Sequence, residues 1–244
     1  MQINPPFGYA EIVPLLKTHR VRLPRRGEVP DFARKLNAIP VSFSEFAAAA
    51  RDYPIVFTSG DNGKSFAPVA VLGMAAGENL FARADGWAPG TYLPAYLRRY
   101  PFCMAKVKLN DVEQQNRMIC VEKKAVDAEG AEAVFDEKGE PTAQWRDMQR
   151  LLAEYEADLE RGRELCAVLA EYALFEPITL QATLNQGGKL QLSGMHRVDE
   201  KKIEHLEVGQ LRNLAHKGML GRIYAHLLSL ENFSRLLERR AARA

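Results

Sequence analysis

Apolar residues recur at helical spacing in two long segments of the chain. The first segment begins at Thr142 and ends near Tyr172, and its apolar positions are Trp145, Met148, Leu151, Leu152, Tyr155, Leu159, Cys166 and Leu169. This spacing predicts one long helix with Thr142 as its N-cap. Gly162 lies inside the pattern, where a glycine costs about 1 kcal/mol relative to alanine. We therefore expect a close packing contact at Gly162.

The second helical pattern occupies residues 220–240, near the C-terminus. Its apolar positions form a broad face: Leu220, Ile223, Tyr224, Leu227, Leu228, Leu230, Phe233, Leu236 and Leu237. Basic residues follow at the C-terminal end, where cations suit the helix dipole. A core or a homodimer would bury such a face. A shorter helix is expected over residues 207–218, with Gly218 ending it.

Short apolar runs with period-two alternation predict antiparallel strands between and after these regions. The expected hairpins pair residues 54–59 with 66–74 across the turn GDNGKS, 103–110 with 116–124 across residues 111–115, and 178–184 with 189–195 across NQGG. Before the first of them, Ser44 or Ser42 is expected to cap a short helix that ends at Pro54.

The order of elements is sheet, long helix, hairpin and helices, which does not alternate as in a doubly wound sheet. The sequence therefore predicts the α+β class, with antiparallel hairpins packed against a long central helix and C-terminal helices. Residues 1–30 are rich in proline and basic side chains and show weak periodicity. We expect a loosely structured N-terminal arm there and a single domain over residues 31–244.

Composition restricts the classes of function. The net charge of +2 comes from 33 basic and 31 acidic residues, a balance that argues against a dedicated nucleic-acid binder. No segment approaches the ~20 apolar residues of a membrane span, so no membrane insertion is expected. The N-terminus lacks the pattern of a signal peptide, and the cysteines Cys103, Cys120 and Cys166 show no metal-ligand spacing. We expect a cytoplasmic protein with three buried thiols.

No common catalytic or nucleotide-binding motif occurs, and GDNGKS lacks the spacing of a phosphate-binding loop. The sequence identifies no cofactor and predicts no metal site. His196 with Asp199 is a loop pair that would bind metal or form a hydrogen bond, while His205 and His216 share a face only if one helix joins them. His226 lies near the apolar face of the last helix. A structural histidine is the expectation in each case.

Acidic residues gather in the turn FDEKGEPT, at Asp136, Glu137 and Glu140. Paired carboxylates perform acid–base chemistry when one of them is desolvated. Three carboxylates in a turn that contains glycine and proline more often form a solvated lead into a helix. An ion pair of Asp136 with Arg98 or Arg99 is a further alternative.

The stretch YLPAYLRRYPF is the best candidate for a ligand site. Prolines bracket a helical turn in which Tyr96 and Tyr100 share a face, and Arg98 and Arg99 point in different directions. Tyrosine with arginine is frequent at interfaces and anion sites. The sequence thus predicts ligand binding by Tyr96, Arg98, Arg99 and Tyr100. The alternative is a structural corner in which the tyrosines fill a seam and an arginine pairs with a carboxylate.

Five segments identify a family resemblance: LNAIPVSFSEFAAAARDYPIVF, VAVLGMAAGENLF, YLPAYLRRYPF, FDEKGEPT and IYAHLLSLENFSRL. In this order they resemble the bacterial SapC family over roughly residues 30–240. The resemblance implies an association with surface-layer genes and with genes for TonB-dependent receptors and halogenase-like proteins. It supplies no catalytic residues. The permease label given to some relatives does not fit a chain without an expected membrane span.

These observations leave three hypotheses of function. The first is a soluble, non-catalytic binding or accessory protein connected to cell-surface or nutrient-uptake systems, with a protein partner or a small ligand. The second is an enzyme or enzyme subunit that modifies a peptide or small molecule, with His196, Asp199, the acidic turn and the arginines as candidate groups. The third is a structural component of a surface layer.

Overall fold

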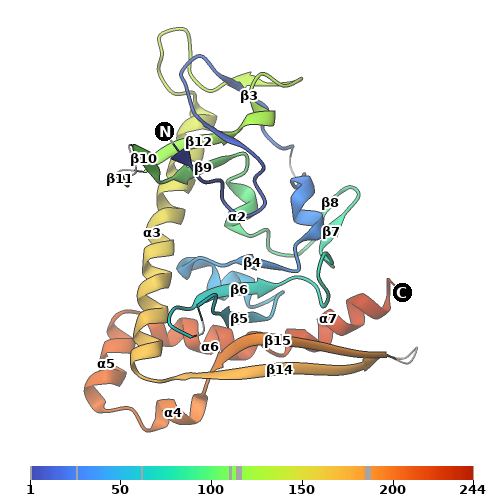
Figure 1. Ribbon diagram of the computed structural model, residues 1–244, viewed down its shortest axis with the longest axis vertical. Coiled ribbons are helices and arrows are strands. Elements are labelled where there is room, and N and C mark those ends of the chain that lie inside the picture. Colours follow the sequence, from blue (N-terminus) through green and yellow to red (C-terminus); the bar gives the residue numbers. More distant parts are fainter. Residues whose placement is uncertain are drawn as a thin grey trace. The chain divides into compact units, whose positions relative to one another are not determined.

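The computed structural model in Figure 1 describes residues 2–25, 27–61, 63–109, 112–113, 117–184 and 188–243. Antiparallel sheets, one long helix and a helical C-terminal region confirm the α+β class. Contacts divide the chain into two compact units. Unit 1 comprises Met1–Ala33, Ala82–Trp87 and Ala95–Ala157, and unit 2 comprises Arg34–Phe81, Ala88–Pro94 and Asp158–Ala244. The predicted domain boundary at residue 30 stays a prediction.

The strands of unit 1 are β1 (Gln2–Ile3), β2 (Ile12–Pro14), β3 (Arg20–Val21), β7 (Ala82–Arg83), β8 (Gly86–Trp87), β9 (Phe102–Ala105), β10 (Val107–Leu109), β11 (Val112–Glu113), β12 (Met118–Glu122) and β13 (Glu132–Ala133). The strands of unit 2 are β4 (Ala38–Pro40), β5 (Ile55–Thr58), β6 (Ala67–Val71), β14 (Phe175–Leu184) and β15 (Gly188–Val198).

The α-helices are α1 (Phe46–Ala49), α2 (Ala95–Arg98), α3 (Ala143–Glu171), α4 (Glu200–Glu204), α5 (Val208–His216), α6 (Met219–Ser229) and α7 (Asn232–Ala241). Short 3-10 helices are η1 (Asp31–Lys35), η2 (Phe43–Glu45) and η3 (Lys123–Ala125). None of the helices in the described ranges combines the length and the hydropathy needed to cross a membrane.

Unit 1 contains several small sheets, ordered β1-β10-β11, β2-β12-β9 and β13-β3, and the pair β7-β8. The predicted hairpin is confirmed where β9 pairs with β12, with Cys103 opposite Cys120. Beyond residue 106 the prediction is wrong, because β10 pairs with β1 and β11 instead. Within the predicted turn, residues 111 and 114–115 lie outside the described residues.

The sequence 1–30, expected to be loosely structured, contributes three short strands that each pair with a strand between residues 107 and 133. Strands of two or three residues are too short to produce a readable alternation. The core of unit 1 is a cluster of buried apolar side chains: Val21, Phe102, Val121, Ala125, Val134, Trp145 and Leu152. The first half of α3 supplies the last two of these.

Unit 2 is built on one five-stranded antiparallel sheet, ordered β14-β15-β5-β6-β4. It contains two of the predicted hairpins, β5–β6 and β14–β15, and both are confirmed. The predicted turn NQGG falls mainly on residues 185–187, outside the described part. Strand β15 continues to Val198, so the expectation that His196 lies in a loop is wrong: His196 pairs with Pro177 on one side and Phe57 on the other.

The predicted single helix over 220–240 is also wrong, because the chain forms α6 and α7 with a break at Leu230–Glu231. Side chains that follow the end of α6 bind the segment before β5. The amide of Asn232 donates to the carbonyl oxygens of Ala50 at 2.8 Å and Tyr53 at 3.3 Å. The prediction used only the spacing of apolar residues, so it took no account of these hydrogen bonds from a polar side chain.

Two cap predictions are confirmed. The Thr142 hydroxyl accepts a hydrogen bond from the N–H of Trp145 at the start of α3 (3.3 Å). Gly218 follows α5 with a φ of 67° and separates it from α6. The predicted short helix consists of η2 followed by α1 and ends at Ala49, before Pro54. Ser42 is the N-cap of η2 and its hydroxyl donates to Glu45 (2.7 Å), whereas the Ser44 hydroxyl bonds to Asp158 of α3.

Candidate functional site

The stretch YLPAYLRRYPF forms the single turn α2 and the residues that follow it. Arg99 is buried, with 3% of its surface exposed, while Arg98 is exposed, so the two arginines do point in different directions. Tyr96 lies within α2 and Tyr100 lies beyond its end, and both rings contact the ring of Tyr9, with centroids 6.5 and 5.5 Å away. The part of the stretch from Ala95 to Phe102 therefore belongs to unit 1 and is buried except for Arg98.

Arg99 is the centre of a group that we name the Arg99 cluster: Tyr9, Tyr96, Arg99, Tyr155 and Glu156. The guanidinium carbon lies 4.4 Å from the ring centroid of Tyr96, 4.7 Å from that of Tyr155 and 5.8 Å from that of Tyr9. Aromatic faces attract a cation at such distances, most strongly where water is excluded. Glu156 completes the group with a carboxylate oxygen 3.8 Å from Arg99.

The polar ends of the cluster are occupied by the chain itself. The Tyr9 hydroxyl donates to the carbonyl oxygen of Phe102 (2.9 Å), and that of Tyr96 donates to the carbonyl oxygen of Phe7 (2.5 Å). Burial raises the pKa of Tyr9 well above its ordinary value. The buried Nε of Arg99 has no hydrogen-bond partner among the described residues. These contacts favour the structural corner, and ligand binding by Tyr96, Arg98, Arg99 and Tyr100 stays a prediction.

The acidic segment FDEKGEPT is a solvent-exposed turn that precedes α3. Asp136, Glu137 and Glu140 are exposed, and an oxygen of Asp136 accepts hydrogen bonds from the N–H groups of Lys138 and Glu140, both at 2.9 Å. These bonds close the turn on itself. The ion pair found for Arg99 is with Glu156, rather than the alternative with Asp136.

His205 and His216 of unit 2 are exposed side chains on different helical segments. His205 follows α4 and His216 ends α5, so no continuous helix joins them. Asp199 is the N-cap of α4 and accepts from the N–H of Lys201 (3.1 Å). Among the residues that the structure describes, no three metal-ligating side chains gather in one place.

His226 is fully buried and joins α6 to the sheet. Its Nε2 accepts from the N–H of Val198 (3.1 Å), so its Nδ1 carries the proton and donates to the carbonyl oxygen of Ile55 (2.7 Å). Burial lowers its pKa to about 4, which keeps the ring neutral. The expectation of a satisfied structural histidine is confirmed for this residue.

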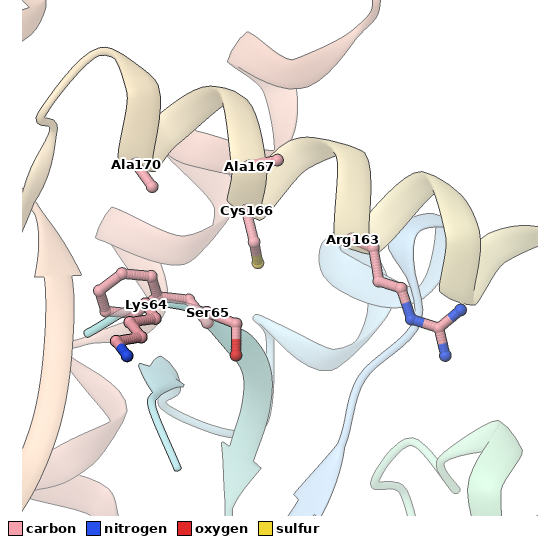
Figure 2. A pocket seen from close by; sticks show the side chains of 7 residues that line it. Lys64, Ser65, Arg163, Cys166, Ala167 and Ala170 are labelled. Carbon is pink, nitrogen blue, oxygen red and sulfur yellow. The ribbon is translucent and has the colours of Figure 1, made fainter. Parts of the chain in front are cut away.

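An apolar cavity of about 230 Å³ lies in unit 2 between the second half of α3 and the start of β6 (Figure 2). We name it the larger hollow, and its lining residues are Lys64, Ser65, Phe66, Arg163, Cys166, Ala167 and Ala170. Figure 2 shows Cys166 and Ala170 on the side of α3 turned toward Lys64 and Ser65, with Arg163 at the other end. Helix residues three or four positions apart share a face, which explains how α3 forms one wall.

A second cavity of about 160 Å³ shares Phe66 and Arg163 with the first. We name it the smaller hollow, and its lining residues are Pro40, Val41, Phe66, Ala67, Pro68, Leu159, Gly162 and Arg163. Among described residues, a Cβ built on Gly162 would meet no atom within 4 Å beyond its own helix backbone and chain neighbours. The close packing contact expected at Gly162 is therefore wrong, because this glycine borders open space.

Rings packed behind Phe66 hold it in place. The Phe66 ring stacks on Phe175 of β14, with centroids 4.0 Å apart, and meets the His196 ring edge-on at 5.0 Å. The Nδ1 of His196 is buried without a hydrogen-bond partner in the described residues. Phe66 is therefore a fixed wall shared by the two hollows.

Asp61 orders the loop that carries Lys64 and Ser65 to the larger hollow. One carboxylate oxygen of Asp61 accepts from the Ser59 hydroxyl (3.0 Å) and the Ser65 N–H (2.8 Å), and the other accepts from the Ser65 hydroxyl (2.6 Å). Hydrogen bonds from Ser65 hold the pKa of Asp61 below its usual value. The loop of this hairpin is thus positioned by its own side chains.

The lining of the hollows suits binding better than covalent chemistry. Burial raises the pKa of Cys166 to about 12, so its thiol stays protonated and behaves as a small apolar group. The cations Lys64 and Arg163 stand at the rim, and the lining residues include no carboxylate. Such a site has an apolar interior and a positively charged edge.

A comparison with protein families matches residues 17–236 to the family described as SapC. This match covers most of the chain. The chain belongs to the SapC family. Searches of curated proteins and of solved structures gave no match. The SapC match begins somewhat before the segments that carry the resemblance in the sequence, so it includes β3 and part of the expected arm.

The sequence of this SapC-family chain does not reveal the hollows, because their walls are ordinary residues. Phenylalanine, alanine and cysteine at helical or strand positions predict a packed core. Gly162 is the one signal that was available, since a glycine in the middle of a long helix needs a reason. The reason that we inferred, close packing, is the opposite of the open space observed.

Proposed function

We propose that this SapC-family protein is a non-catalytic binding or accessory protein, and that the two hollows of unit 2 form its ligand site. The observation that carries the proposal is the concave, mainly apolar space between α3 and β6, because small-molecule sites are typically concave, mostly apolar and edged by a few polar groups. A fixed aromatic wall and a cationic rim support a binding role. The Arg99 cluster supports it less, since its own contacts fill it.

We further propose that the protein acts in the cytoplasm of a bacterial cell and serves cell-surface, surface-layer or nutrient-uptake systems. The SapC membership supports this proposal through the associations of the family. Cell fractionation with an antibody against the native protein tests the location. Recovery in the surface-layer fraction alone would favour a structural component of the coat instead.

Isolation from native cells tests the binding role. A tagged protein, purified without denaturant and analysed by native mass spectrometry, is expected to retain a small molecule or a protein partner at a fixed stoichiometry. Purification that returns only the bare chain from several growth conditions would contradict the proposal. Turnover of a co-purified molecule would favour an enzyme or enzyme subunit.

A second copy of this chain is the protein partner that exposed apolar side chains support. Large apolar side chains are exposed on α5 and α6: Val208, Leu211, Tyr224 and Leu228. Two of these, Tyr224 and Leu228, belong to the face that the sequence predicts to be covered by a core or a dimer. Light scattering over a range of concentrations tests the homodimer, and a constant monomer mass would contradict it.

A further inference from the structure

We infer that the two hollows take an amphipathic carboxylate, with an apolar body beside Gly162 and Cys166 and the anionic end at Lys64. This inference rests on the proposed binding function and adds the chemical class of the ligand. The same chemistry occurs in a free arylalkanoic acid and at a peptide C-terminus that ends in phenylalanine.

Gly162 indicates that the space is reserved for an occupant. It is buried and lies in the interior of the 29-residue helix α3, where alanine would stabilise the helix. Its backbone conformation needs no glycine, since its φ is outside the left-handed range, and a methyl group would meet no atom. Neither backbone geometry nor packing within the described residues explains the glycine. Room for a ligand does.

The volumes set the size of the apolar body. An apolar cavity of roughly 150 Å³ is enough to hold benzene. The larger hollow has about 230 Å³ and the smaller hollow adds a space of about 160 Å³ beside it. One aromatic ring therefore fits the smaller hollow beside Gly162, and the larger hollow holds the remaining chain that leads past Cys166 to Lys64. The shared wall, Phe66, offers an aromatic face against which a ring can stack.

The charges at the rim select the sign of the polar end. Lys64 and Arg163 line the hollows, and the described lining residues include no carboxylate to repel an anion. Arg163 pairs with Glu160 one turn earlier on α3, in an exposed contact. Lys64 is carried by the loop that Asp61 orders, so it is the cation placed to meet a carboxylate. An ammonium is a point charge on a flexible stem and adapts to such a partner.

Calorimetric titration of the full chain with 3-phenylpropionate tests the inference, with the neutral 3-phenylpropionamide as the matched ligand. We expect the acid to bind more tightly than the amide. In Lys64→Gln the affinity for the acid is expected to fall about two- to fivefold, as for an exposed ion pair, while the amide is unaffected. N-acetyl-glycyl-phenylalanine distinguishes the sources, because tighter binding of this peptide would indicate a protein C-terminus.

Variants of Gly162 separate the ligand from the fold. Gly162→Ala is expected to raise the Tm by about 2–4 °C through helix propensity and to weaken binding of 3-phenylpropionate, and Gly162→Leu is expected to abolish binding. Gly221→Ala in α6 is the matched control: it is an exposed helical glycine, outside both hollows, with equally open space around it. That variant should gain stability and bind normally.

The experiments test the location of the site, the charge of the ligand and the binding function separately. Unchanged binding in Gly162→Ala and Gly162→Leu would overturn the site. Equal binding of acid and amide would overturn the anionic class, although binding in the hollows would stand. If neither compound nor the peptide binds at millimolar concentration, the carboxylate inference falls. The binding function itself falls only if native isolation also returns the bare chain.

Discussion

The Arg99 cluster and the larger hollow differ in both composition and packing: charged and aromatic residues pack closely in the cluster, whereas mainly apolar residues surround an open space in the hollow. The Arg99 cluster of unit 1 contains a buried cation, three tyrosines and a carboxylate, which pack against one another, and the hydroxyls of Tyr9 and Tyr96 bond to backbone carbonyl groups of the same unit. The larger hollow of unit 2 is lined by alanine, cysteine and phenylalanine and remains empty of protein atoms. Residues that are typical of binding sites here fill a core, and residues that are typical of cores surround a space.

The difference has a physical reason. A buried guanidinium costs much free energy unless carboxylates, carbonyl groups or aromatic faces surround it. The chain must therefore close around Arg99, which leaves no room for a ligand. Small apolar groups make no such demand, so a space can remain between Gly162 of α3 and Phe66, both of which line the smaller hollow. Polar and aromatic residues in the sequence thus indicate a packed cluster here, whereas a candidate ligand site is recognised by open space in the structure.

Substitution of Arg99 tests whether the Arg99 cluster stabilises the fold, and it has the largest expected effect. Arg99→Ala removes the cation that the three tyrosine rings surround and opens a cavity among them, while Glu156 keeps its ion pair with Arg117, so we expect a loss of about 3 kcal/mol in the free energy of unfolding. Urea denaturation measures it. Arg98→Ala, the exposed neighbour, is the control and should change stability by no more than about 0.5 kcal/mol. Equal effects of the two variants would contradict a structural Arg99.

Acid is expected to weaken unit 2 through His226. Its pKa is lowered to about 4 from an ordinary value of 6.5, so between these values the unfolded chain binds a proton that the folded chain does not. Stability therefore falls as the pH drops from 6.5 toward 4, by about 2 kcal/mol between pH 7 and pH 5. Denaturation at several pH values measures this loss. His226→Gln should show a smaller loss over the same range, and an equal loss in both proteins would refute the assignment.

The alkylation rates of Cys103 and Cys166 compare access to the two regions, with a smaller expected effect. Burial raises the pKa of both Cys103 in unit 1 and Cys166 in unit 2 to about 12, so a difference in alkylation rate reports access rather than acidity. Both thiols are buried, but Cys166 lines the larger hollow with 3% of its surface exposed, whereas Cys103 has none exposed. We expect iodoacetamide to label Cys166 several-fold faster in the native protein, as measured by peptide mass spectrometry. Faster labelling of Cys103 would argue against an accessible hollow.

The sequence predicted those parts of the fold that depend on local pattern. The helix α3, its cap at Thr142 and the hairpins β5–β6 and β14–β15 follow from periodicity and from turn residues. The break between α6 and α7 did not follow, because LLSLENFSRLL continues a helical pattern. The break is accompanied by bonds from Asn232 to Ala50 and Tyr53, which are distant in sequence.

The site was harder to predict than the fold. The sequence drew attention to Tyr96, Arg98, Arg99 and Tyr100 because of their chemistry, and it correctly separated the directions of the two arginines. It contained no information about Glu156 as the partner, which approaches from α3. A cavity depends on how distant elements fail to fill space, and no local pattern records that.

The most direct test of the central claim is an NMR titration that asks which of the two regions binds. Isotope-labelled full-length protein would be titrated with 3-phenylpropionate while the backbone amide signals are followed. Our account predicts that the largest shifts fall on Phe66 and on residues 159–170 of α3, with little change from Tyr96 to Tyr100. Shifts concentrated at Tyr96–Tyr100 and Arg99, with α3 residues 159–170 unmoved, would contradict it.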